Sequence, residues 1–186
     1  LSTGDHLVVT RPNYATNLET PRAIGADVSI LDLSYDDGWR VDPGRLATLL
    51  RPETRLVSIT TPHNPTGQVI AEADLARIVA TVEAHPRAML LVDETYRELT
   101  FGTAPPLAAD RSPRVISVSS LSKAYGLPGI RLGWLVTRDQ ELFEHALAAK
   151  EQMVITGSTV DEAIGFEALR RRDELLQLPE EPGRGS

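Results

Sequence analysis

The chain has 186 residues, 41% hydrophobic and 24% charged, a composition typical of a globular domain rather than of a disordered or coiled-coil protein. Its 26 acidic residues outnumber the 19 lysines and arginines, and the net charge of −7 is the wrong sign for binding a nucleic-acid backbone. It has no cysteine, no metal-ligand spacing among its four histidines and no apolar run of about 20 residues, so we expect no disulfide, metal site or membrane span and a cytoplasmic location.

Short β-branched runs alternate with helical patterns in the first half of the chain. The runs predict strands at 7–10, 28–33, 56–60 and 88–93, and the patterns predict helices at 43–50 and 72–84. This alternation is typical of a parallel sheet whose strands are connected by crossover helices.

The order changes after residue 93. Two further strands are predicted at 115–119 and 132–136, and the connector 120–131 between them shows no helical period. A parallel crossover needs a dozen or more residues and usually a helix, so these two strands are expected to be antiparallel neighbours. The predicted fold is therefore α/β, a mixed, mostly parallel sheet with crossover helices and one antiparallel strand.

Two helices are predicted near the end of the chain. The first spans 139–150 and is capped by Asp139; the second spans 159–176, with Ser158 or Thr159 near its start. The arginine run 170–172 is interpreted as a solvated helix face. The last ten residues, 177–186, are rich in Pro, Glu and Gly and are expected to form a disordered tail after a single domain at 1–176.

Residues just after the strands are the first candidates for a site, because ligands of open α/β sheets collect at the carboxyl ends of the strands. Four segments occupy such positions: 11–14, 61–67, 93–96 and 120–123. They contain the chemistry-bearing side chains Tyr14, Asn64, Asp93, Tyr96 and Lys123.

Three of these segments resemble motifs of the class I/II, fold-type I aminotransferases, which depend on pyridoxal 5′-phosphate. The segment 120–133, SLSKAYGLPGIRLG, resembles the cofactor-lysine signature over its whole length. Asn64-Pro65-Thr66-Gly67 and Asp93-x-x-Tyr96 resemble the two other cofactor motifs, in the family's order. The resemblance implies the large domain of such an enzyme, with an amino acid and a 2-oxo acid as substrates.

The resemblance also implies a role for each site residue. Lys123 would form a Schiff base with the cofactor aldehyde and then move a proton, and Asp93 would keep the pyridine nitrogen protonated. Lys123 is one of only two lysines in the chain, which argues against an incidental surface position. Tyr96 and Asn64 would hydrogen-bond the phenolic oxygen of the cofactor. Taken alone, Tyr96 is more typical of a core aromatic residue, and Asn64 of a turn residue set by Pro65 and Gly67.

The remaining candidates concern the phosphate and the ring face. Arg131, eight residues after Lys123, would clamp the phosphate, with Ser120 and, less specifically, Ser122 as hydroxyl donors. Tyr14 would stack on the pyridine ring. The alternatives are a surface ion pair for Arg131 and simple packing on the sheet for Tyr14. The family often has cis bonds before prolines at positions 12 and 65, and we expect a cis Asn64-Pro65 bond.

The resemblance stops short of a whole enzyme. Full members are about twice as long, as suits a two-domain protein. We expect this sequence to lack the amino-terminal segment that holds most of the cofactor phosphate and the small domain that binds the substrate carboxylate. We expect the chain alone to be inactive and its parent to be a homodimer.

Other functions fit the same motifs. Another fold-type I reaction, such as that of a C–S lyase, a decarboxylase, a cyclase or a synthase, would use Lys123, Asp93 and Arg131 alike. A regulator with an aminotransferase-like sensor domain would need a basic DNA-binding extension. An inactive remnant would fold without binding cofactor.

Overall fold

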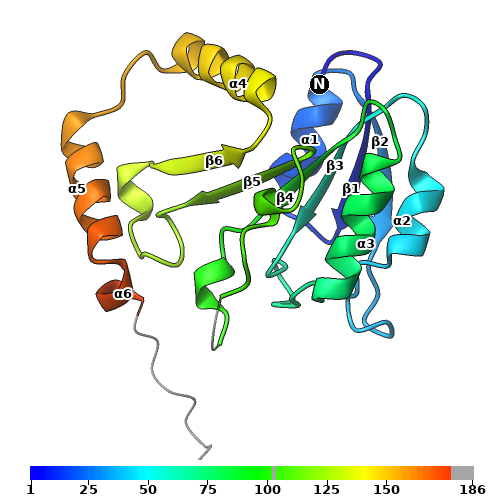
Figure 1. Cartoon of the computed structure of the whole chain (residues 1–186), viewed down its shortest axis with the longest axis horizontal. Coiled ribbons are helices and arrows are strands. Elements are labelled where there is room, and N and C mark those ends of the chain that lie inside the picture. Colours follow the sequence, from blue (N-terminus) through cyan, green and yellow to red (C-terminus); the bar gives the residue numbers. More distant parts are fainter. Residues whose placement is uncertain (102–103, 177–186) are drawn as a thin grey trace, which may run out of the picture.

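A computed structural model describes residues 1–101 and 104–176; the predicted tail at 177–186 lies outside the described residues. In the described part of the chain, six strands form one sheet in the order β2-β1-β3-β4-β5-β6 (Figure 1). Their bounds are β1 His6–Arg11, β2 Asp27–Asp32, β3 Thr54–Thr60, β4 Met89–Asp93, β5 Val115–Ser120 and β6 Gly133–Thr137. All neighbouring pairs are parallel except β5 and β6, which confirms the predicted fold class and the reversed last strand.

The helices connect and cover these strands. Their bounds are α1 Ala15–Ala23, α2 Pro43–Leu49, α3 Glu72–Glu83, α4 Gln140–Met153, α5 Thr159–Arg170 and α6 Arg172–Leu175. Three short 3₁₀ turns, Arg97–Leu99, Ala108–Asp110 and Pro128–Ile130, lie in the connections that follow β4 and β5. Asp139 caps α4 as predicted, and α5 is capped by Ser158, one of the two predicted candidates; each side chain accepts a hydrogen bond from the backbone N–H three residues on.

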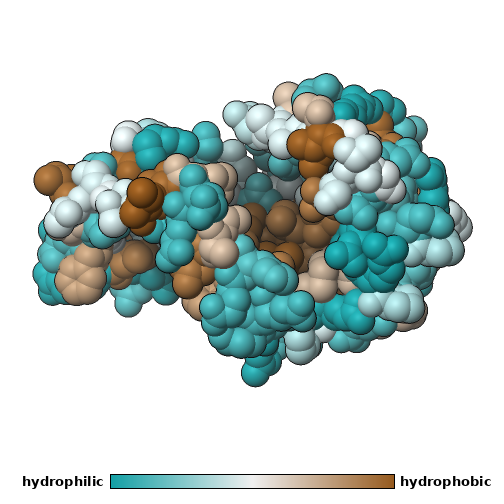
Figure 2. Space-filling model, turned by 90° about the horizontal axis from the view of Figure 1, so that it is seen from above, coloured by the Kyte–Doolittle hydropathy of each residue, from teal (hydrophilic) through white to brown (hydrophobic). Residues whose placement is uncertain are grey.

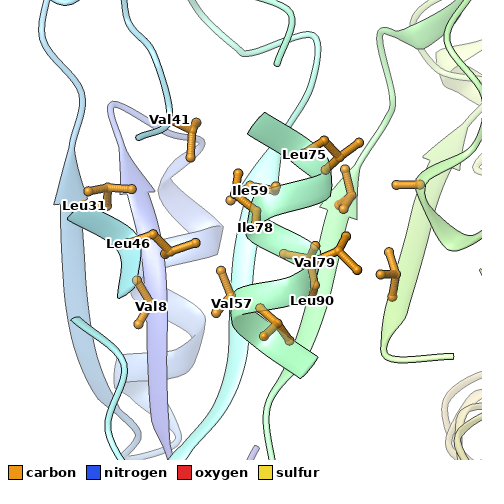
Figure 3. Packing of buried hydrophobic residues seen from close by; sticks show 14 of the residues in the cluster. Val8, Leu31, Val41, Leu46, Val57, Ile59, Leu75, Ile78, Val79 and Leu90 are labelled. Atoms are coloured by element: carbon orange, nitrogen blue, oxygen red, sulfur yellow. The ribbon is translucent and has the colours of Figure 1, made fainter. Parts of the chain in front are cut away.

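The hydrophobic core lies between the sheet and the pair α2 and α3. Leu46 of α2 and Ile78 of α3 are fully buried against alternate residues of the parallel strands, among them Val57, Ile59 and Leu90. Figure 3 shows these side chains between the helices and the strands, with α1 behind the sheet. The strand side chains that are buried on both faces give the near-continuous apolar runs seen in the sequence.

Two helical predictions need correction. Helix α1 was not predicted: it contains Pro21 and lacks a clear apolar face, so its sequence carries no helical periodicity. The single helix predicted at 159–176 is two helices, because Arg171 leaves the helical conformation with φ −102° and ψ 24°.

Apolar side chains remain on the surface after β6. Met153, Ile155, Val160 and Phe166 of α4, α5 and their connection are 68–81% exposed. A hollow of about 590 Å³ lies toward the amino-terminal ends of the central strands, and apolar strand residues such as Leu91 line it. Figure 2 shows hydrophobic surface at the bottom of a hollow on this side of the molecule. No helix among the described residues has the length and apolar character needed to cross a membrane.

Candidate active site

A cleft of about 340 Å³ lies at the carboxyl ends of β1, β3, β4 and β5. These strands are neighbours in the sheet, so the segments that follow them meet at one edge. All eight residues predicted from the sequence line this cleft: Tyr14, Asn64, Asp93, Tyr96, Ser120, Ser122, Lys123 and Arg131. Predicted residues up to 117 positions apart in the chain therefore share one pocket, Tyr14 and Arg131 being the extremes of that set.

Asp93 is the last residue of β4 and faces Thr60 of β3 and Val118 of β5 in the sheet register. The backbone N–H and the hydroxyl of Thr95 both donate to Asp93 Oδ1, at 3.0 Å and 2.6 Å. Among the described residues, no hydrogen bond reaches Oδ2. The carboxylate is thus held by one oxygen, and the other is available to a ligand.

Glu94, the next residue, is buried behind the cleft and holds the chain that follows β4 in place. The residue is 3% exposed, and its side chain accepts a hydrogen bond from the backbone N–H of Ala108. This bond ties the start of the connection after β4 to its second 3₁₀ turn. Burial raises the pKa of Glu94 above its ordinary value.

Lys123 lies in a tight turn immediately after β5. The N–H of Gly126 donates to the carbonyl of Lys123, and Gly126 has a φ of +67°, which an ordinary side chain rarely adopts. Below the turn, buried Tyr125 packs edge-on against Trp134 of β6, with ring centroids 6.2 Å apart. The turn is therefore anchored while the Lys123 side chain remains exposed at the cleft.

Arg131 lines the cleft from the other end of the β5–β6 connection. It has a left-handed backbone with φ 52°, and its Nη1 donates to the carbonyl of Pro128 at 2.9 Å. A non-glycine residue in this region is uncommon and is held there by its surroundings, often at functional sites. The reversal of the chain between β5 and β6 brings Arg131 back to the side of Lys123.

Tyr14 and Asn64 come from the loops after β1 and β3. Tyr14 is 63% exposed and precedes α1, and its N–H donates to the side chain of Asn13. Asn64 is half-buried in a turn closed by the N–H of Gly67 on the carbonyl of His63. The Asn64-Pro65 bond is cis, as predicted, and so are the bonds before Pro12 and Pro62.

Four other residues line the cleft that the sequence reasoning did not identify: Asn13, Thr60, Thr95 and Pro128. Asn13 and Thr95 hold neighbouring site residues through the hydrogen bonds described above. Their proximity to the motifs was the only sequence signal, because Thr and Asn are also ordinary turn residues.

The chain matches the family model "Aminotransferase class I and II" over residues 1–181. The chain belongs to the class I and II aminotransferase family. Capreomycidine synthase of Streptomyces vinaceus is 33% identical, over 92% of this chain and 44% of that protein. Histidinol-phosphate aminotransferase of Symbiobacterium thermophilum is 34% identical, over 91% of this chain and 45% of that protein. A crystal structure of a PLP-dependent aminotransferase from Streptococcus suis superposes with a TM-score of 0.87 and 30% identity, over 95% of this chain and 46% of that one.

Membership of the aminotransferase family implies pyridoxal 5′-phosphate as the cofactor. The side chains of the cleft suit that molecule: an amine for its aldehyde, a carboxylate for its ring nitrogen, and a guanidinium and hydroxyls for its phosphate. The chain spans about half the length of the relatives it matches.

Proposed function

We propose that the protein is a pyridoxal-phosphate-dependent aminotransferase, which moves an amino group between an amino acid and a 2-oxo acid. The observation that carries the proposal is the convergence of Lys123, Asp93 and Arg131 in one cleft with the five other predicted residues. Residues 1–176 would supply the cofactor-binding domain of this enzyme.

Bound pyridoxal phosphate would supply an electron sink that makes the substrate α-carbon acidic. Asp93 would accept a hydrogen bond from the ring nitrogen through Oδ2 and keep that nitrogen protonated. Thr95 would support this role by fixing the orientation of the carboxylate through Oδ1.

Lys123 would bond covalently through Nζ to the cofactor and, once released, carry a proton to and from the substrate α-carbon. The anchored turn around Gly126 and Tyr125 would give this long side chain a fixed starting point. The exposure of Lys123 at the cleft leaves its amine accessible to a substrate.

Arg131 would bind the phosphate, with hydroxyl donors from Ser120 and Ser122. A guanidinium offers two parallel donors to a phosphate, a match that an ammonium group lacks. Tyr14 would cover one face of the ring, and Asn64 and Tyr96 would hydrogen-bond its phenolic oxygen.

A different fold-type I reaction is the second candidate function. It is favoured by the similarity to a relative whose name denotes a synthase, capreomycidine synthase, at 33% identity. Both functions use the same cofactor residues, so only products distinguish them: a transaminase returns a 2-oxo acid from an amino acid, and a synthase of this kind does not. We also infer from the family a homodimeric parent in the cytoplasm, which size-exclusion chromatography and fractionation would test.

The first experiment is an absorbance titration of the chain with pyridoxal 5′-phosphate, before and after borohydride, followed by peptide mapping. We expect a visible band and a reduced adduct on Lys123 that Lys123→Ala abolishes. Lys150→Ala is the matched control, because Lys150 is the other lysine of the chain and lies in α4, outside the cleft. An adduct on Lys150, or none in a folded sample, would overturn the proposal for this chain.

A further inference from the structure

His63 is a buried side chain that the proposed mechanism does not use. It lies between β3 and the turn that carries Asn64, and it is 3% exposed. Its Nε2 is 2.9 Å from the carbonyl oxygen of Pro12, and its Nδ1 is 2.8 Å from Thr66 Oγ1. The imidazole therefore joins the loop after β1 to the loop after β3.

The hydrogen bonds define which tautomer His63 adopts. A carbonyl oxygen only accepts, so Nε2 carries the proton, and Nδ1 then accepts from the hydroxyl of Thr66. The same hydroxyl accepts from the N–H of Gln68 at 3.3 Å, so its donor and an acceptor position are both used. Burial lowers the pKa of His63, which favours this neutral form.

Each loop joined by His63 carries a residue of the cleft. Pro12 is two positions before Tyr14, and His63 is directly before Asn64. The His63 backbone also closes the Asn64 turn, since its N–H donates to Gln68 and its carbonyl accepts from Gly67, at 2.8 Å and 2.7 Å. Movement of this imidazole would therefore change the position of Asn64 relative to Tyr14.

We propose that His63 is a positioning residue that fixes the Tyr14 loop against the Asn64 loop and so sets the width of the cofactor-ring site. The inference rests on the proposed function for what the cleft binds. The connection through the His63 imidazole is present in the cofactor-free chain, so the role of His63 and the proposed function can be tested separately.

His6 provides a matched control on the same strand as the Pro12 loop. It is 1% exposed and also has both ring nitrogens in hydrogen bonds, to Thr54 Oγ1 at 2.7 Å and Ser29 Oγ at 2.9 Å. It lies at the amino-terminal end of β1, opposite the cleft. His6→Ala thus creates a similar buried defect without touching either loop.

Amide hydrogen exchange of the cofactor-free chain tests whether the His63 imidazole holds the two loops together. In His63→Ala we expect exchange about tenfold faster in peptides covering 12–17 and 63–68, since one or two hydrogen bonds are lost, and unchanged exchange in α3. His63→Gln, which keeps a donor and an acceptor, should recover part of the protection. His6→Ala should leave both peptides as in the wild type.

Cofactor affinity is the second readout. Titration with pyridoxal 5′-phosphate should show about tenfold weaker binding in His63→Ala and wild-type binding in His6→Ala.

Two results would overturn the inference: an equal loss of cofactor affinity in His63→Ala and His6→Ala, or unchanged exchange at 12–17 in folded His63→Ala. If His63→Ala does not fold, Thr66→Val, which removes the Nδ1 partner, must show the faster exchange instead. A wild-type chain that binds no cofactor would contradict the proposed function, and the exchange data would still decide the role of His63.

Discussion

Gly133 lies directly opposite Ser120 across the antiparallel pair β5 and β6, and a Cβ at Gly133 would come within 2.7 Å of the carbonyl oxygen of Ser119. Such a contact is closer than real side chains make, so only glycine fits. This close approach keeps the end of β5, where the Lys123 loop begins, next to the start of β6, and Arg131 lies two residues before Gly133.

Gly133→Ala is therefore expected to push β6 away from β5. The clash is with backbone, which cannot rotate aside, and we expect a loss of about 1–3 kcal/mol in the free energy of unfolding. Urea denaturation followed by circular dichroism measures it. Gly129→Ala is the control in the same connection, because a Cβ there would meet no atom within 4 Å. Equal stability of the two variants would show that β5 and β6 separate at no cost.

Arg131 combines a strained backbone with a charged side chain, and two variants separate these properties. Arg131→Gly suits the φ of 52° but removes the guanidinium, whereas Arg131→Lys keeps a charge on the same backbone. We expect Arg131→Gly to fold normally and to lose about tenfold of its preference for pyridoxal 5′-phosphate over pyridoxal, with Arg131→Lys between it and the wild type. Competitive titration measures the preference. An unchanged preference in Arg131→Gly would exclude Arg131 as a phosphate ligand.

Thr95 is expected to affect cofactor binding by holding the carboxylate of Asp93 in position. Thr95→Val keeps the shape but removes the hydroxyl that donates to Oδ1 at 2.6 Å, and the loss of one hydrogen bond to a carboxylate corresponds to about 1.5–3 kcal/mol at most. We expect cofactor binding to weaken about tenfold, as measured by fluorescence titration, and Thr95→Ser to restore it. Failure of the serine variant to do so would mean that the methyl group of Thr95, and not its hydroxyl, supports the site.

His6 predicts a dependence of stability on pH. Burial, and secondarily the positive charge of Arg51, lowers the pKa of His6 below its ordinary 6.5. As the pH falls below about 6.5, the unfolded chain takes up a proton that the folded chain resists, so the free energy of unfolding decreases towards acid pH. Glutamine does not titrate in this range. The difference in free energy of unfolding between the wild type and His6→Gln should therefore become smaller from about pH 7.5 to about pH 5.5. A constant gap would show that His6 has the same pKa in both states.

Most of the fold could be predicted because the strands are apolar and the crossover patterns α2 and α3 are amphipathic. The connector 120–131 was too poor in helical signal for a crossover, which is why β6 was predicted to be antiparallel. Helix α1 could not be predicted: its stability comes from packing against the sheet, with Pro21 buried, and not from its own pattern. The end of α5 at Arg171 has no glycine or proline to mark it.

The site was predictable to a different extent. The strand ends and the family motifs pointed to all eight residues that the structure brings to one cleft. Thr95 had only a weak signal, its position two residues after Asp93, and His63 had none, because its role depends on a partner that the fold supplies. For His63 the partner is the carbonyl of Pro12, 51 positions earlier in the chain, and no side-chain pattern identifies a backbone acceptor.

The apolar side chains of Met153, Ile155, Val160 and Phe166 have a practical consequence for every one of these measurements. Four large hydrophobic residues, each more than two-thirds exposed, are expected to promote association with other copies and adsorption to apolar surfaces. The colloidal behaviour of the chain will therefore depend on its concentration and on sulfate or phosphate in the buffer, which strengthen apolar association. Measurements should therefore use dilute samples in low salt, checked by light scattering, so that a weak cofactor signal can be distinguished from the effects of aggregation.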